Sequence, residues 1–172
     1  ARMAALGGNQ VAINDSADLN VSYNNPSLLK PDMKNQLSVN YVGYFAGINY
    51  GYASYSFGLP LPGNFAAGIN YINYGKFIEA LPSGDKTGTS FGAAEYALNL
   101  IWSNNFHQFT YGINLKPILS TFESYQSFGL AADLGMTYFS KNQSTTIAMV
   151  ARNVGSQLTT YYDGAGKETI PF

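Results

Sequence analysis

The stretch 106–116, FHQFTYGINLK, decides the fold. From residue 108 onward, polar or small side chains alternate without a break with apolar ones. The apolar positions are Phe109, Tyr111, Ile113 and Leu115. Only a β-strand repeats every two residues, so the stretch is predicted to be a strand with one apolar and one polar face. It is about as long as the roughly 9 to 11 residues that a tilted strand needs to cross a bilayer.

The segments 93–102 and 130–139 repeat the same alternation on either side of this stretch. In each of them one face is apolar, while the other is small, polar or charged. In a water-soluble β-sandwich the polar face would meet solvent. In an outer-membrane barrel it would line the lumen, and the apolar face would meet lipid. The alternation alone leaves both architectures open.

The composition favours a barrel wall. Charged residues make up 11% of the chain and aromatic residues 15%, including 14 Tyr, whereas soluble domains are about 25% charged. No run of about 18 apolar residues is present, so no transmembrane helix is predicted. The net charge is −1 and the basic residues do not cluster, so nucleic acid is not an expected partner.

The chain divides into two parts. Residues 1–35 have no sustained period and contain turn signals, with one short helical turn expected near 26–29. Residues 36–172 carry the alternating segments. Seven strands are predicted, at 36–42, 48–53, 65–71, 93–102, 108–116, 130–139 and 145–154.

The connections between these strands suggest an orientation. From the third strand onward they run long (75–88), short (103–105), medium (117–124), short (140–143), and long again after Gly155. Outer-membrane barrels have short periplasmic turns and longer external loops. This alternation predicts that residues 1–35 lie on the periplasmic side, where they could plug the lumen. Seven strands cannot close a bacterial barrel of eight or more, so further strands are expected beyond residue 172.

Four charged residues are candidates for the lumen or for contact with the N-terminal segment: Glu95, Lys116, Asp133 and Arg152. They could line a path or pin that segment through charge-assisted hydrogen bonds, or they could be hydrated residues that balance one another. A set of aromatic side chains is assigned to the apolar faces and predicted to form interfacial girdles. It consists of Tyr41, Tyr50, Tyr52, Tyr71, Tyr96, Trp102, Tyr111 and Tyr138.

Two loops place apolar and aromatic residues where water is expected. Phe77, Ile78 and Leu81 lie in the loop 75–88, and Tyr161 and Tyr162 lie in the late loop. Exposed groups of this kind are favoured protein contacts, so they are candidate partner-binding residues in extracellular loops. Folding back over the barrel mouth is the alternative role.

Nothing in the sequence indicates catalysis, a cofactor or a metal. His107 is the only histidine and cysteine is absent, so neither a metal-ligand cluster nor a nucleophile and base arrangement is evident. His107 is expected to be solvated or interfacial. The carboxylates Glu95 and Asp133 do not by themselves indicate a glycosidase, because that chemistry requires a defined separation between the two groups.

Several stretches together resemble a known family. They are ARMAALGG (1–8), NPSLL (25–29), YFAGINYGYASYSF (44–57), FAAGINYINYGKF (65–77), FGAAEYAL (91–98), NLKPILSTFESYQSFGLAADLG (114–135) and RNVGSQLTTYY (152–162). In register, and over nearly the whole chain, these stretches resemble the PorQ family. Its members are outer-membrane components of the type IX secretion system of Bacteroidota.

The resemblance implies a FadL-like transmembrane β-barrel of about fourteen strands with an N-terminal hatch. Residues 1–35 would be the periplasmic hatch, and residues 36–172 the N-terminal half of the barrel in the bacterial outer membrane. The implied role is not enzymatic. The barrel would anchor a PorZ-like surface protein in an attachment complex, alongside a PorU-like sortase and a PorV-like barrel, and that complex links secreted cargo to lipopolysaccharide.

Two other functions remain open from the sequence. One is a FadL-like transporter for hydrophobic small molecules, which would need a continuous apolar pocket beneath the hatch. The other is a soluble β-sandwich binding module. The small and polar inward positions favour the anchoring role over the transporter.

Overall fold

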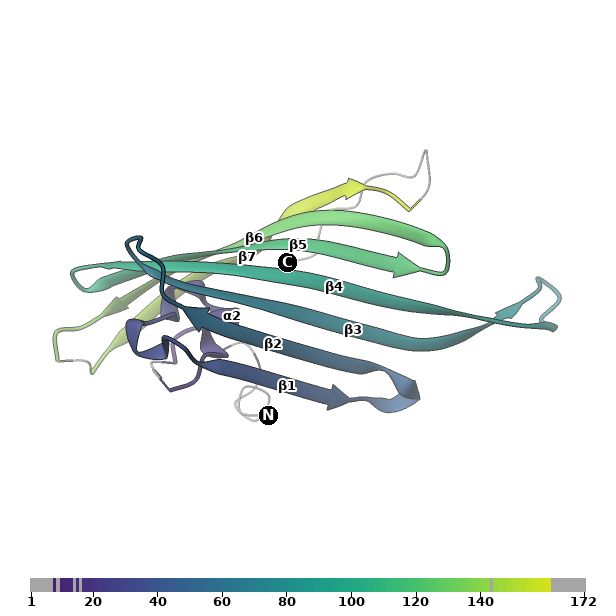
Figure 1. Ribbon diagram of the computed structural model, residues 1–172, viewed down its shortest axis with the longest axis horizontal. Coiled ribbons are helices and arrows are strands. Elements are labelled where there is room, and N and C mark those ends of the chain that lie inside the picture. The colour runs from purple at the N-terminus through teal and green to yellow at the C-terminus, as the bar shows by residue number, and fades with distance from the viewer. Residues whose placement is uncertain (1–7, 9, 14, 16, 143, 162–172) are drawn as a thin grey trace.

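The computed structural model describes residues 8, 10–13, 15, 17–142 and 144–161 (Figure 1). Its fold is all-β: one antiparallel sheet of seven strands in the order β1 to β7. The strands are β1 (Leu37–Gly43), β2 (Asn49–Phe57), β3 (Asn64–Ala80), β4 (Lys86–Phe106), β5 (Phe109–Phe122), β6 (Tyr125–Phe139) and β7 (Thr146–Thr159). Within this part of the chain, no helix is both long enough and apolar enough to cross a membrane.

Each strand pairs with its neighbour in sequence, so the sheet is a simple meander. Among the described residues β1 and β7 are its two edges, and the sheet is not closed. The two faces of the sheet differ as the alternation predicts. In β5, Asn114 is fully buried while Leu115 is 47% exposed, and in β6, Asp133 is 1% exposed while Leu134 is 48% exposed.

The segment before β1 covers the polar face of the sheet, which we call the inner face. It consists of helix α2 (Val21–Asn24) and two 3-10 turns, η1 (Pro26–Leu28) and η2 (Pro31–Met33), and η1 confirms the predicted helical turn. Figure 1 shows this segment at the end of the sheet where the β2–β3, β4–β5 and β6–β7 turns lie. We call this the seat end, and the opposite end, with the β3–β4 turn, the hairpin end.

The buried apolar residues lie between the N-terminal segment and the inner face. Leu19, Val21, Leu28, Leu29 and Met33 cluster with residues 66 and 101 of the sheet. Leu28 and Met33 are completely buried. Burying one such side chain contributes about 1.5–3 kcal/mol. The apolar core is therefore small, and it fixes the segment to the sheet.

The predicted loop 75–88 is wrong, because β3 continues to Ala80 and β4 begins at Lys86. The glycines and charges that indicated a loop are accommodated by register shifts in the β3–β4 ladder. Cross-strand contacts hold this ribbon together: the rings of Phe77 and Phe91 stack at a centroid distance of 5.5 Å. Such pairs stabilise a hairpin regardless of the charges beside them.

The predicted connection 117–124 is also mostly strand, because β5 continues to Phe122. Pro117 is tolerated where the β4–β5 pairing is interrupted, between the pairs Ala97↔Ile118 and Leu100↔Leu115. Proline has no backbone N–H to donate, and this costs little stability where no cross-strand hydrogen bond is required. The described turns then cover 81–85, 107–108, 123–124 and 140–145, so the expected alternation of long and short connections is not found.

Two of the aromatic residues assigned to the apolar faces lie on the inner face instead. Tyr52 is only 4% exposed, and its ring lies 5.0 Å from that of Tyr23 in α2. The Tyr50 hydroxyl accepts a hydrogen bond from the inward-facing Asn70. In β2 the outward positions carry small or mixed residues instead, such as Gly51 and Ala53. Assigning the more hydrophobic side chains to the outer face therefore gave the wrong orientation for this strand.

Candidate functional site

The most tightly built contact of the inner face is the seat of Asn25, Pro26 and Ser27 on two paired glycines. Gly112 of β5 and Gly135 of β6 are register partners. A Cβ atom on Gly112 would lie 2.4 Å from the carbonyl carbon of Pro26, and one on Gly135 would lie 2.2 Å from Asn25 Oδ1. The two glycines therefore provide the space that the backbone of η1 occupies.

Hydrogen bonds from Thr137 of β6 complete this seat. Asn25 Nδ2 donates to Thr137 Oγ1 at 2.9 Å, and the Ser27 hydroxyl lies 2.7 Å from the same oxygen. Asn25 Oδ1 in turn accepts from the Ser27 backbone N–H at 3.0 Å, which caps the 3-10 turn. All three side chains are buried, so water cannot reach their polar groups. The hydrogen bonds between them satisfy these groups instead.

A second attachment follows directly along the chain. The carbonyl oxygen of Leu29 accepts hydrogen bonds from Ser103 Oγ at 2.6 Å and from Asn64 Nδ2 at 3.2 Å. These two side chains come from neighbouring strands, β4 and β3. Asn25, Ser27 and Leu29 thus bond the N-terminal segment to β3, β4 and β6, and Pro26 packs against Gly112 of β5.

A continuous row of amide side chains crosses the inner face beyond the seat. Asn70 Nδ2 donates to Tyr23 Oη at 3.1 Å, and Asn99 Nδ2 donates to Asn70 Oδ1 at 2.7 Å. Asn114 Nδ2 then donates to Asn99 Oδ1 at 3.0 Å and lies 3.4 Å from Asp133 Oδ2. The row links β3, β4, β5 and β6 to the segment and gives each of the three asparagine NH2 groups a partner, while Asn114 Oδ1 stays buried without one.

The row ends at a buried ion pair. Lys116 Nζ lies 2.6 Å from Asp133 Oδ1, and the two side chains are 8% and 1% exposed. Asn153 of β7 supports both partners: its backbone N–H donates to Asp133 Oδ1 at 2.7 Å, and its Oδ1 accepts from Lys116 Nζ. A buried pair requires such extra hydrogen bonds to offset the cost of desolvating two charges.

An irregularity in β7 brings Asn153 and Arg152 to this place. The β6–β7 register shifts between the pairs Ala132↔Val154 and Leu134↔Ala151, and Asn153 has a φ of 56°. Bulges of this kind redirect side chains. The Arg152 guanidinium lies 5.9 Å from the ring centroid of Tyr23. Tyr23 is also the residue whose hydroxyl accepts a hydrogen bond from Asn70.

A cavity of about 420 Å³ lies on the inner face next to the ion pair. Among the predicted inward charges, Lys116 and Glu95 line it directly. Amides and tyrosines supply half of the remaining lining, namely Tyr23, Tyr50, Asn70, Asn153, Gln157 and Tyr161. The lining thus mixes polar and apolar groups, and Tyr161, expected in an external loop, contributes to this cavity.

The other predicted partner-binding residues lie at the hairpin end. Beyond the last pairs with β2 and β5, at Asn73 and Ala93, the β3–β4 ribbon continues alone. Ile78 is 58% exposed and Leu81 is 53% exposed. Phe77 is also exposed but packs against Phe91 and Phe122. Tyr162 lies outside the described residues.

The described ranges contain no cluster of side chains suited to hold a metal ion. No group of three or more metal-ligating side chains occurs among those residues. His107 occupies the two-residue β4–β5 turn with a φ of 56° and stacks edge-on against Phe106. This position agrees with the solvated or interfacial role expected for it.

The sequence-based interpretation expected Glu95, Lys116, Asp133 and Arg152 on the inner side, where the structure has them, but it missed the residues that form the seat. Gly112, Gly135 and Thr137 stand at polar-face positions of β5 and β6, where alternation had already placed them. Glycines at such positions signal a close backbone approach. The asparagines 70, 99 and 114 carry a similar signal, because a buried amide requires an amide or hydroxyl partner.

Comparison of this chain with models of known protein families, with curated protein sequences and with solved structures finds no match. The fold and the site define the class of this protein by its architecture alone. It is an all-β chain whose antiparallel seven-stranded meander binds its own N-terminal segment on a polar inner face.

Proposed function

We propose that this chain is one part of the wall of an outer-membrane β-barrel, with the N-terminal segment as its periplasmic hatch. The observation that carries the proposal is the distribution of polarity. Outward side chains of the middle strands, such as Leu98, Leu115 and Leu134, are apolar and 47–48% exposed. The opposite face is polar and covered by the chain's own segment, as in a barrel with a filled lumen.

The proposed role is to anchor a surface protein, as the resemblance to the PorQ family implies. In this arrangement the seat end faces the periplasm and the hairpin end faces outward. The partner would be a PorZ-like surface protein, working with a PorU-like sortase, a PorV-like barrel and lipopolysaccharide. The β3–β4 ribbon supports this role, because it extends past both neighbouring strands and exposes Ile78 and Leu81.

Transport of hydrophobic molecules receives less support from the cavity. A greasy channel would require an apolar pocket beneath the hatch. The described cavity instead has a mixed lining, in which Lys116, Glu95 and several amides lie beside apolar residues such as Ile72 and Ile118. We therefore propose a non-enzymatic anchoring subunit in preference to a transporter.

The test is a detergent pull-down of the protein from native outer membranes. The variant Ile78→Ser/Leu81→Ser removes exposed apolar surface at the hairpin end without touching the Phe77 ring cluster. The matched control is Leu59→Ser/Leu61→Ser, since these two side chains are 45% and 59% exposed in the β2–β3 turn at the seat end.

A surface protein recovered with wild type and with the control, but reduced at least tenfold with the hairpin variant, supports anchoring through the ribbon. A tenfold loss corresponds to about 1.4 kcal/mol of binding free energy. Equal recovery with all three proteins would show that the ribbon is not the contact. Recovery of the barrel alone, with bound lipid or fatty acid, would favour the transporter.

A further inference from the structure

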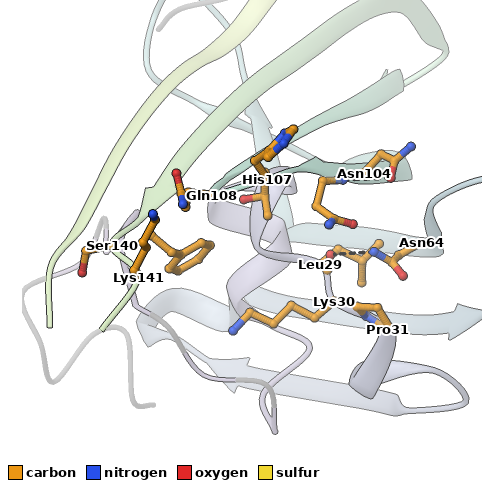
Figure 2. Close-up of a pocket in the computed structure, with 12 residues that line it drawn as sticks. Leu29, Lys30, Pro31, Asn64, Asn104, His107, Gln108, Ser140 and Lys141 are labelled. Carbon is orange, nitrogen blue, oxygen red and sulfur yellow. Dashed lines mark hydrogen bonds between the residues drawn. The ribbon is translucent and has the colours of Figure 1, made fainter. Parts of the chain in front are cut away.

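A second cavity, separate from the one beside the ion pair, opens at the seat end. It has a volume of about 520 Å³, within the range of small-molecule sites. Figure 2 shows Leu29, Lys30 and Pro31 of the N-terminal segment on one side of it, and Asn104 of β4 with His107 and Gln108 of the β4–β5 turn on the other. Ser140 and Lys141 of the β6–β7 turn close a third side. The cavity therefore exists only when the segment is seated.

The charges that line this cavity are all of one sign. Lys30 and Lys141 contribute ammonium groups from two different elements, and His107 adds a titratable ring. No carboxylate is among the described residues that line it. The nearest acidic influence on Lys30 comes from Asp32 and Asp15, which lie outside the lining. An anionic group would thus find attraction on two sides of the cavity.

Lys30 is held in place rather than freely solvated. Its Nζ lies 5.4 Å from the ring centroid of Phe139, which also lines the cavity. Burial lowers the pKa of Lys30, although Asp32 and Asp15 oppose this shift. A desolvated ammonium group gains more from an anionic ligand than a fully hydrated one.

Amide groups provide hydrogen-bonding capacity next to these cations. Asn105 and Gln108 line the cavity, and within the described ranges their side-chain amides have no hydrogen-bond partner. Each amide offers two donors and an acceptor. Leu29, Pro31 and Phe139 give the same cavity an apolar floor. Paired donors and acceptors beside an aromatic ring suit the hydroxyl groups and the apolar face of a sugar.

We propose that the seat-end cavity binds a small anionic saccharide, with Lys30 and Lys141 contacting its carboxylate or phosphate and Gln108 and Asn105 contacting its hydroxyl groups. The size of the cavity fits one or two sugar rings. The site does not depend on the anchoring role, since its residues lie at the opposite end of the sheet from the β3–β4 ribbon. Its ligand reaches it from the water on the seat side.

The test is isothermal titration of the whole protein in an uncharged polyoxyethylene detergent, which carries no sugar. The probes are glucose 6-phosphate, glucuronate, glucose and inorganic phosphate. We expect saturable binding of at least one charged sugar and at least tenfold weaker binding of glucose. The tighter of the two charged sugars identifies phosphate or carboxylate as the anionic group.

Variants locate the binding. Lys141→Gln changes an exposed turn residue and should weaken the charged sugar at least tenfold, as should Lys30→Gln. Lys34→Gln, on the same segment but outside this cavity, is the matched control and should bind as wild type does. Gln108→Ala should weaken the sugar phosphate more than inorganic phosphate.

Three results would overturn the proposal. They are the absence of saturable binding of either charged sugar at millimolar concentration, equal affinity for glucose and the charged sugars, and unchanged affinity in both Lys30→Gln and Lys141→Gln. Loss of partner recovery in the pull-down would leave this site unaffected, so the two proposals fail independently.

Discussion

The two ends of the sheet are built in opposite ways. At the seat end, glycines and hydroxyl groups of β5 and β6 admit the backbone of Asn25 and Pro26 to van der Waals contact, and the contacting side chains are buried. At the hairpin end, β3 and β4 continue without neighbours, and side chains such as Ile78 are more than half exposed. The same alternating strands thus serve an internal contact at one end and an open surface at the other.

The difference between the ends is one of side-chain volume and satisfied polarity. The inner face has glycines and a threonine where Asn25, Pro26 and Ser27 approach, and amides and charges farther along the strands. This arrangement makes the seat end sensitive to single substitutions, since buried polar groups lose partners that water cannot replace. The hairpin end should tolerate changes, since its groups are hydrated.

The largest effect is expected at the buried ion pair. Asp133→Ala leaves Lys116 buried without its counter-ion, and we expect a loss of about 3–5 kcal/mol in the free energy of unfolding. The measurement is denaturant unfolding followed by Trp102, the only tryptophan. The control is the double variant Lys116→Met/Asp133→Leu, which should recover most of the loss. A single variant as stable as wild type would contradict a paired, desolvated Lys116.

Closing the glycine seat is expected to have the next largest effect. Gly112→Ala places a Cβ 2.4 Å from the Pro26 carbonyl carbon, so the segment must shift, at a cost of about 1–3 kcal/mol. Amide exchange of residues 21–33 should increase. Gly51→Ala is the control, because a Cβ there meets nothing within 4 Å. Equal exchange in the two variants would mean that Gly112 does not form the seat.

Removing the hydroxyl that bonds the segment should have a similar or smaller effect. Thr137→Val removes one hydrogen bond from Asn25 Nδ2 and one from the Ser27 hydroxyl, although Asn25 keeps Val11 O and Ser27 keeps Asn25 Oδ1 as partners, and we expect a loss of about 1–2 kcal/mol. Thr110→Val is the matched control on β5, since its hydroxyl makes only a 3.4 Å contact with a backbone carbonyl. If both variants lose equal stability in denaturant, the Thr137 bonds do not hold the segment.

The smallest effect is expected at the hairpin end and depends on pH. Hydrogen bonds from Thr89 and Thr87 lower the pKa of the exposed Glu79 carboxyl. Its contribution to hairpin stability is therefore present above the unfolded pKa of about 4.3 and is lost as pH falls through the folded pKa. Amide exchange at residues 86–90 should rise on acidification in wild type but much less in Glu79→Gln. Identical exchange profiles in wild type and in Glu79→Gln would show that the Glu79 carboxylate does not stabilise the hairpin.

The strands and their faces could be predicted from sequence because alternation is a local property. β4, β5 and β6 have the faces expected, down to the inward positions of Lys116 and Asp133. The strand ends could not be predicted, because Phe77 and Phe91 extend the ribbon through a contact between residues distant in sequence. Tyr50 and Tyr52 were misplaced for a similar reason: their inner-face partners, Tyr23 and Asn70, are set by the fold.

The seat itself lies beyond what sequence alone can show. The stretch 25–29 predicts a short helical turn but not its contact with the sheet, and Gly112 and Gly135 resemble any small residues on a polar face. Their pairing across β5 and β6 is a matter of register. Alternation fixes the face of each residue but leaves open which partner approaches it.

The central claim is that the two ends of the sheet lie on opposite sides of an outer membrane, and single-cysteine labelling tests it most directly. The chain contains no native cysteine. Ser83→Cys places a thiol in the exposed 81–85 turn, and Leu59→Cys places one in the exposed β2–β3 turn at the seat end. On intact cells, a membrane-impermeant maleimide should label only Ser83→Cys, and Leu59→Cys should react after the outer membrane is permeabilised. Labelling of both or of neither on intact cells, or labelling of Leu59→Cys alone, would contradict the account.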